Sequence, residues 1–328
     1  MVQEGPGTIF LDFDETLTQA DTCVEFSAMA HPEQGLARQS NQLLYARLAR
    51  DYGEARSEFL ARHVPRGRAA KFDPDLLRWF LKESSTFDRA MMEKVEESGV
   101  LEGITVDQIT RQAAEGESEL QVGVAEFLNA AHAAKYGLVV SSNNWSRRYI
   151  LGVLAKGFNQ ARLRLGDDWV TVYANELVMD PVKLGCTGRT DHANATVDSK
   201  GMRVRLHKMG VEGWSCFVGN SEGDIAAMMQ CNVGIIVGPV HDDLAQIIEG
   251  FGMRLLPLEA SSLRHGRDGR DRPDVWTLLP PSKGVLHLAA DWAEVARVVL
   301  GQDIHPNSPA RAKKSASGIP VTSLQLQG

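Results

Sequence analysis

Two carboxylates follow the first apolar stretch of the chain, and their spacing suits acid–base or nucleophilic chemistry. Residues 8–11 (TIFL) are apolar and β-prone, and Asp12 and Asp14 come directly after them, separated by one phenylalanine. If the strand pleat continues, the two carboxylates face the same side. A divalent cation would relieve their repulsion, and one carboxylate could then act as a nucleophile while the other handles a proton. Taken alone, the pair also fits a solvated turn.

Two further polar clusters follow apolar runs later in the chain. Ser141 and Ser142 come after residues 138–140 (LVV), and residues 219–224 (GNSEGD) come after the apolar run 214–218. In an open parallel sheet, ligands gather at the carboxyl ends of the strands. We therefore expect the three clusters to meet in one site.

The elements that would position these clusters alternate between short apolar strands and amphipathic helices from about residue 123 onward. We predict strands at 8–11, 138–140, 170–173, 214–218 and 233–237, and helices near 124–131, 145–156, 199–209 and 224–229. This alternation predicts an α/β fold with a mainly parallel, Rossmann-like sheet that helices cover on both faces. Residues 285–300 should add ordered structure that ends in an amphipathic helix.

A helix-rich stretch separates the first two clusters. Residues 22–118 contain few β-branched runs, and prolines punctuate them, which indicates a separate all-helical unit of several short helices. We therefore expect residues 1–21 and 119–301 to form the core and residues 22–118 to form a helical cap. The arginine-rich segment 264–272 should be an exposed loop, and residues 302–328, rich in Pro, Ser, Lys and Gln, a disordered tail.

Composition limits the class of protein. The 328 residues are 43% hydrophobic with a net charge of −7, and a mildly acidic chain argues against nucleic acid as the main partner. The N-terminus lacks the basic region and apolar stretch of a signal peptide, and no apolar run reaches the length of a membrane span. Four scattered cysteines fit a reducing compartment. We expect a cytoplasmic protein that binds no membrane.

The clusters together resemble the motifs of the haloacid dehalogenase (HAD) superfamily. FLDFDETLT resembles its first motif, hhhhDxDxT, and Ser141 follows LVV as the serine or threonine of the second motif does. Lys200 in VDSKG resembles the lysine of the third motif, and FVGNSEGD resembles the fourth, GDxxxD. Residues 174–180 (ANELVMD) resemble the strand pair that precedes the third motif in phosphoserine-phosphatase-like members. The resemblance spans roughly residues 8–240, and it implies a helical C1-type cap. Residues 144–146 (NWS) further resemble a fungal phosphatase-like group.

This resemblance implies a mechanism and a ligand set. Asp12 would attack phosphorus and form an aspartyl-phosphate, and Asp14 would protonate the leaving group and then activate water. Mg²⁺ would neutralise charge in an all-oxygen site. The phosphoryl oxygens would be bound by Thr16, Ser141, Ser142 and Lys200, and the metal by Asp12, Asp14 through its main-chain carbonyl, Asn220 and Asp224.

Some assignments stay open on the residues alone. Ser141 is preferred to Ser142 because it directly follows the apolar run, and Lys183 and Lys208 are alternatives to Lys200. Two residues also depart from the family pattern. Asn220 stands where an aspartate usually ligates the metal, which should weaken Mg²⁺ binding, and Glu15 stands where glycine is commoner.

The leading interpretation is a Mg²⁺-dependent phosphatase that hydrolyses a small phosphomonoester metabolite. One alternative is a catalytically weakened HAD domain that binds a phosphorylated ligand or a protein, and Asn220 is the residue that favours it. Another is a phosphomutase. Asp14 argues against a dehalogenase, because a halide needs no proton when it leaves.

Overall fold

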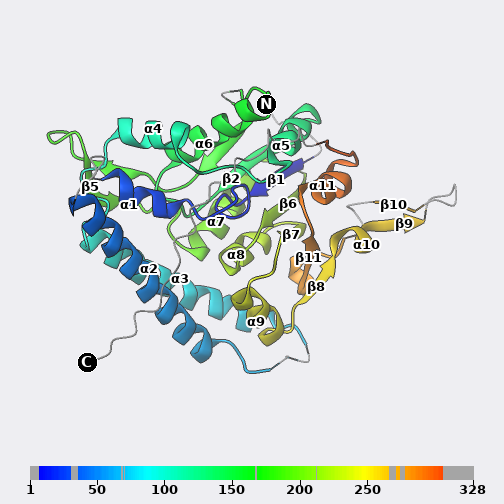
Figure 1. The fold of residues 1–328 in the computed structure, drawn as a ribbon. Helices are drawn as coiled ribbons and strands as arrows, with labels where there is room; N and C mark the ends of the chain where they lie inside the picture. Colours follow the sequence, from blue (N-terminus) through cyan, green and yellow to red (C-terminus); the bar gives the residue numbers. More distant parts are fainter. Residues whose placement is uncertain are drawn as a thin grey trace, which may run out of the picture.

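A parallel sheet of seven strands forms the centre of the molecule (Figure 1). The computed structural model describes residues 7–30, 36–67, 69, 71–166, 168–211, 213–265, 271–273 and 278–305. All neighbouring strands of the sheet run parallel, which confirms the predicted α/β class. The strand order is β3 (Val170–Tyr173), β2 (Gly137–Ser141), β1 (Gly7–Leu11), β6 (Trp214–Gly219), β7 (Val233–Val237), β11 (Val285–Ala289) and β8 (Arg254–Pro257).

Helices cover both faces of this sheet. One face packs against α5 (Val124–Ala133), α6 (Arg147–Gln160) and α11 (Trp292–Val295), with α10 (Leu258–Ser262) beside α11. The other face packs against α7 (Val197–Met209), α8 (Ile225–Met228) and α9 (Asp242–Gly250). The strands and helices expected from about residue 123 onward are thus present, with ends shifted by a few residues.

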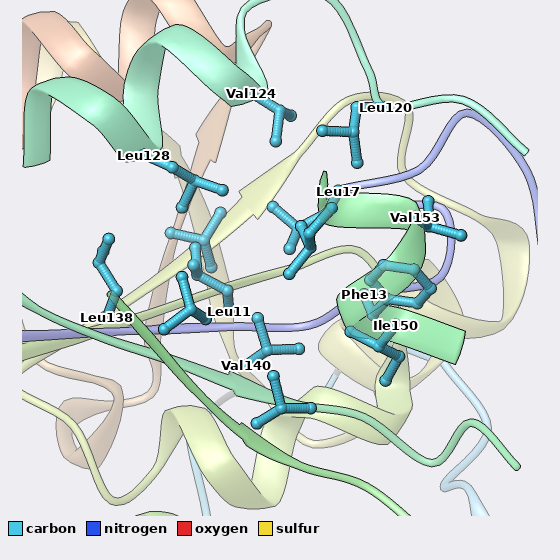
Figure 2. Close-up of a cluster of buried hydrophobic side chains, with 14 of the residues drawn as sticks. Leu11, Phe13, Leu17, Leu120, Val124, Leu128, Leu138, Val140, Ile150 and Val153 are labelled. Atoms are coloured by element: carbon cyan, nitrogen blue, oxygen red, sulfur yellow. The ribbon is translucent and has the colours of Figure 1, made fainter. Parts of the chain in front are cut away.

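The pleat of β1 sorts its side chains between the two faces. Ile9 and Leu11 are fully buried in the cluster under α5 and α6, whereas Phe10 is fully buried in the cluster under α7 and α8. Phe13 and Leu17 continue the first cluster beyond the end of the strand, and Figure 2 shows both among the labelled apolar side chains. The chain after β1 is therefore anchored on one face of the sheet.

The helical segment that follows β1 is built differently from our expectation. It comprises α1 (Phe26–Met29), α2 (Leu36–His63), α3 (Pro74–Glu97) and α4 (Val106–Glu115). The expectation of several short helices is wrong for α2 and α3, which have 28 and 24 residues. Helix α3 begins where Asp73 accepts hydrogen bonds from the amides of Asp75 and Leu76, directly before Pro74.

This segment also shares its hydrophobic core with the sheet. Phe59 and Phe80 belong to the cluster that contains Phe10, and the Phe80 ring lies 5.0 Å from that of Phe251. Helix α4 packs along α6, with Ala113 buried in the cluster that contains Leu11. The helices thus do not form an independently packed unit, and the division into core and cap stays a prediction.

Smaller elements complete the description. The strand pair expected near residues 174–180 is present as β4 (Leu177–Met179) and β5 (Cys186–Thr190), which are antiparallel. The prediction of a loop at 264–272 is wrong in part, because β9 (Leu263–His265) and β10 (Asp271–Pro273) pair as antiparallel strands. Most of the expected tail, from residue 306 onward, lies outside the described residues. Within the described ranges, no helix has the length and apolar character needed to cross a membrane.

Candidate active site

Asp12 lies at the carboxyl end of the central strand β1. Its amide donates a 2.9 Å hydrogen bond to the carbonyl of Val218, which continues the β1–β6 ladder by one residue. Leu11 and Phe13 on either side are fully buried under α5 and α6. The pleat therefore directs the Asp12 side chain toward the opposite face, where α7 packs. This local packing explains why an acidic residue can be 6% exposed at this position.

A buried lysine from α7 meets this carboxylate. Lys200 Nζ lies 2.6 Å from Asp12 Oδ1 and 2.6 Å from Asp224 Oδ1. The expected helix start is confirmed, since α7 begins at Val197 behind a capping box of Thr196 and Ser199. Of the alternative lysines, Lys183 is exposed near Glu102 and Lys208 donates to the carbonyl of Gln230, so neither takes this place.

The Asp12–Lys200–Asp224 triad has one group that can be positively charged and two that can be negatively charged. Burial is the largest cause that raises the pKa of Asp12 to about 7, and Asp224 adds to it while Lys200 opposes it. Burial acts against the charge of Lys200, but Asp12 and Asp224 outweigh this effect and raise its pKa. One buried cation thus serves two carboxylates, and a site of this kind gains from an additional positive charge.

Asp14 has different partners. Its Oδ1 accepts hydrogen bonds from the amide (2.9 Å) and hydroxyl (2.6 Å) of Thr22, and its Oδ2 accepts one from Asn144 Nδ2 at 3.0 Å. Burial, followed by the charge of Asp21, raises the pKa of Asp14 to about 6, against the lowering effect of these hydrogen bonds. A carboxyl group with such a pKa can give and take a proton near neutral pH.

A cavity of about 340 Å³ gathers most of the residues expected from the sequence. It is lined by Asp12, Asp14, Ser142, Lys200 and Asn220, together with Asn143 and Asn144 from the chain after β2. The prediction that three clusters meet at the carboxyl edge of the sheet is confirmed for these residues.

Three expected residues do not line this cavity but support it. Thr16 Oγ1 donates to Asn220 Oδ1 at 3.1 Å, and so ties the first cluster to the last. Ser141 is fully buried, and its Oγ accepts from Asn194 Nδ2, so the preference for Ser141 over Ser142 is not supported by the geometry. Both oxygens of Asp224 are occupied, one by Lys200 and the other by the amides of residues 220 and 221.

Asp224 also explains the glycine that opens its motif. A Cβ at Gly219 would collide with the Asp224 carboxylate, so the close approach of backbone and carboxylate requires glycine. Asp224 therefore positions Lys200, and the structure does not place it as a free metal ligand. Glu15, the other departure from the motif, has φ of +56°, a conformation that glycine adopts without strain and that explains why glycine is commoner there.

Two asparagines that the sequence analysis did not single out hold the loop after β2. Asn175 Nδ2 donates to the carbonyl of Asn143 at 2.9 Å, and Asn194 Nδ2 donates to the carbonyl of Ser142 at 2.8 Å. The backbone N–H of Asn194 in turn donates to Asn175 Oδ1. Both side chains are fully buried, and Asn175 lies in the segment ANELVMD, which was recognised only as a strand pair.

A cation from the helical segment closes one side of the cavity. Arg56 of α2 is 4% exposed and pairs with Glu222 at 2.7 Å, and it also donates to Ser84 Oγ at 3.1 Å. Its buried Nε has no hydrogen-bond partner among the described residues. Nothing in the local sequence of α2 distinguishes this arginine from its exposed neighbours, because only the tertiary packing buries it.

The oxygen ligands available in this cavity fit a hard divalent cation. Asp12 has a second carboxylate oxygen beside the one that Lys200 holds, and Asn220 contributes an amide oxygen. Asp14, Asp21 and Cys23 form another group whose ligand atoms lie within 4.8 Å of one another. Burial raises the pKa of the Cys23 thiol well above its usual value, so this thiol stays protonated and is a poor ligand.

Comparisons with known proteins give one relative and several solved structures. No family model matches the chain. The bifunctional TH2 protein, mitochondrial, of Arabidopsis thaliana is 24% identical over 319 residues, which cover 89% of this chain and 49% of the relative. The chain therefore spans about half the length of the relative that it matches.

Three solved structures show what this chain is similar to. A HAD family hydrolase from Salmonella enterica covers 74% of this chain and 65% of its own at 11% identity, with a TM-score of 0.45. A cytosolic 5'-nucleotidase IIIB bound to cytidine covers 90% and 84% at 14% identity (TM-score 0.43). A phospho-aspartyl intermediate analogue of phosphoserine phosphatase covers 74% and 91% at 14% identity (TM-score 0.42).

Proposed function

We propose that this chain is a phosphohydrolase of the HAD type, which hydrolyses a small phosphomonoester through an aspartyl-phosphate on Asp12 with the help of Mg²⁺. The observation that carries the proposal is the buried contact of Lys200 Nζ with Asp12 and Asp224, at 2.6 Å each, beside a cavity that Asp14 also lines. A carboxylate at a strand end, next to a fixed cation and a second carboxyl group, suits phosphoryl transfer.

The roles of the residues follow from their positions. Lys200 and Ser142 line the cavity and can hold phosphoryl oxygens. A carboxylate oxygen of Asp12 attacks phosphorus, the ester P–O bond breaks, and Asp14 gives its proton to the leaving oxygen. Asp14 then takes a proton from water, which attacks phosphorus and releases Asp12 and phosphate. Thr22 and Asn144 hold the Asp14 carboxyl group in place for both proton transfers.

Mg²⁺ would be held by Asp12, Asn220 and the main-chain carbonyl of Asp14, and it would neutralise the charge of the transferring phosphoryl group. This ligand set omits Asp224, because Lys200 holds one of its oxygens and the amides of residues 220 and 221 hold the other. Among the described residues, Asn220 Oδ1 accepts a single hydrogen bond, from Thr16. The uncompensated carboxylate of the Asp12–Lys200–Asp224 triad supports a cation at this place. A panel of phosphorylated metabolites assayed with Mg²⁺, with Asp12→Asn as the blank, tests the function. If no member of the panel is hydrolysed above this blank, the proposal is wrong.

The second candidate function is binding of a phosphorylated ligand or a protein without turnover. Asn220 favours it, because a neutral amide oxygen replaces a charged metal ligand and the site loses one negative charge. A phosphatase should respond to the Asn220→Asp substitution with a changed Mg²⁺ dependence of its activity, whereas a protein that only binds its ligand has no phosphatase activity to change.

We expect Asn220→Asp to lower the Mg²⁺ concentration needed for half-maximal phosphatase activity by roughly tenfold, because a carboxylate binds a hard cation more tightly than an amide does. Thr16 can still donate to the new carboxylate, so the local geometry should persist. Activity is measured against Mg²⁺ concentration for both proteins.

Asn232→Asp is the matched control, since the Asn232 side-chain oxygen accepts hydrogen bonds from Ser215 and lies outside the cavity. Its Mg²⁺ dependence should equal that of the wild type. An unchanged Mg²⁺ dependence in Asn220→Asp itself would remove Asn220 from the metal site.

A further inference from the structure

A second cavity adjoins the candidate active site. It measures about 480 Å³, and four of its lining residues also line the first cavity: Asp21, Tyr52, Asp88 and Asn143. The two cavities therefore meet at these side chains. A phosphoryl group beside Asp12 and Lys200 would leave the rest of its ester to occupy the second cavity.

The lining of the second cavity is largely apolar and aromatic. It includes Tyr45 and Leu48 of α2, Met91, Met92 and Val95 of α3, and Trp145 after β2. Aromatic faces and thioethers bind a hydrocarbon body well, and the faces of tyrosine and tryptophan also attract cations.

The charged side chains of this cavity are mostly acidic. They are the exposed Asp21 and Asp51 and the half-buried Asp88, against the exposed Lys94. Asp51 lies 3.8 Å from Arg47, whereas Asp21 and Asp88 take part in no ion pair within the described ranges. Asp21 accepts a hydrogen bond from the Cys23 amide, and Asp88 accepts a 3.4 Å one from the Val197 amide. Burial raises the pKa of Asp88 to about 6, although Arg56 opposes this effect.

One buried polar atom at the junction of the two cavities lacks a partner. Asn143 Oδ1 makes no hydrogen bond to the residues that the structure describes. The Trp145 side chain, which is 9% exposed, instead interacts with the Tyr45 hydroxyl in the second cavity. Buried polar atoms usually have partners, so Asn143 Oδ1 indicates that a ligand or water completes the cavity.

The arrangement disfavours a leaving group that carries a second anionic group. A carboxylate or second phosphate here would face Asp21 and Asp88. Arg56, a buried cation that lines the first cavity, already pairs with Glu222 at 2.7 Å. A positively charged leaving group meets the opposite situation, with aromatic faces around it and the carboxylates of Asp21 and Asp88 beside it.

We propose that the substrate is the phosphomonoester of a cationic alcohol, whose charged nitrogen is surrounded by carbon and lies among Tyr45, Trp145, Asp21 and Asp88. This inference rests on the proposed phosphatase function of the adjoining site. It names the chemical class of the leaving group, which the catalytic residues alone do not determine.

The test compares two phosphomonoesters that have the same shape and differ only in charge. Phosphocholine carries a quaternary nitrogen where 3,3-dimethylbutyl phosphate carries a neutral carbon. We expect wild-type kcat/KM for phosphocholine to exceed that for the neutral ester by about tenfold or more. Asp88→Asn should move the ratio toward one. Asp75→Asn, the same change at an exposed carboxylate of α3 that pairs with Arg78 outside both cavities, should leave the ratio unchanged.

Binding gives a measurement that needs no turnover. Calorimetry of the wild type should show choline binding more tightly than 3,3-dimethylbutanol. Equal affinities of the two alcohols, or equal kcat/KM of the two esters, would overturn the inference. If choline is preferred but neither these esters nor acetyl phosphate is hydrolysed with Mg²⁺, the binding inference stands and the phosphatase function fails. If acetyl phosphate is hydrolysed and choline is not preferred, the function stands and this inference fails.

Discussion

Asp12→Asn should reduce kcat by at least about a thousandfold at saturating substrate and Mg²⁺, because an amide cannot serve as the nucleophile that takes up the phosphoryl group. Lys200 and Ser142, the cavity residues proposed to hold phosphoryl oxygens, should still bind the phosphate of the substrate. KM should therefore change much less than kcat. Steady-state kinetics on any hydrolysed phosphomonoester checks this result.

The same variant should be at least as stable as the wild type, because Lys200 keeps Asp224 as its ion-pair partner. Its stability therefore separates a chemical effect from misfolding. The pKa of Asp12 is raised to about 7 in the fold, so its ionisation opposes folding. A carboxyl group whose pKa is raised by folding favours the folded state when it is protonated. The contribution of Asp12 to the free energy of unfolding is therefore fully present below its unfolded pKa near 3.8 and is lost as the pH rises toward 7. In EDTA at pH 8, Asp12→Asn should thus melt at a higher temperature than the wild type. A variant that melts lower would contradict this electrostatic account.

Lys200→Met should be the most destabilising change in the site. It leaves Asp12 and Asp224 buried together without a cation, and losing one partner of a buried ion pair costs about 3–5 kcal/mol. The free energy of unfolding from urea titration should fall by that amount. Phosphatase activity should fall by roughly a hundredfold or more, because the variant also removes the residue proposed to hold a phosphoryl oxygen.

Lys208→Met on the same helix is the matched control, since Lys208 Nζ donates to the carbonyl of Gln230 and does not line the cavity. It should cost less than about 1 kcal/mol. The double variant Lys200→Met with Asp224→Asn should recover part of the lost stability, because it removes one of the two unpaired carboxylates. If Lys200→Met unfolds at the same urea concentration as the wild type, the buried triad does not exist as described.

The sequence alone was sufficient to predict the strands and the helix that position this site. The strand before Asp12, the helix before Lys200 and the strand before Asn220 each have a clear apolar pattern, and parallel strands bring their ends to one edge. Spacing could not distinguish Ser141 from Ser142, because both follow the apolar run. The difference arises from Asn194, which binds Ser141 Oγ from a distant loop.

Other features were missed because they depend on contacts between segments that are distant in the sequence. Arg56 lies in a charged stretch of α2 and becomes a cavity residue only because α2 and α3 pack toward the sheet. Local composition suggested that α2 and α3 belong to a separate unit. They instead share a hydrophobic cluster with β1, β2 and β6, which composition alone does not reveal. The strands β9 and β10 lie in an arginine-rich stretch with glycines, a composition typical of loops.

The most direct test of the account asks which residue carries the phosphoryl group during turnover. The enzyme is mixed with substrate and Mg²⁺, quenched within milliseconds and treated with borohydride, which reduces an aspartyl-phosphate to homoserine. Peptide mass spectrometry then locates the change. The account predicts homoserine at position 12 in the wild type and none in Asp12→Asn. Homoserine at another aspartate, or phosphate release with no modified aspartate at any quench time, would contradict it.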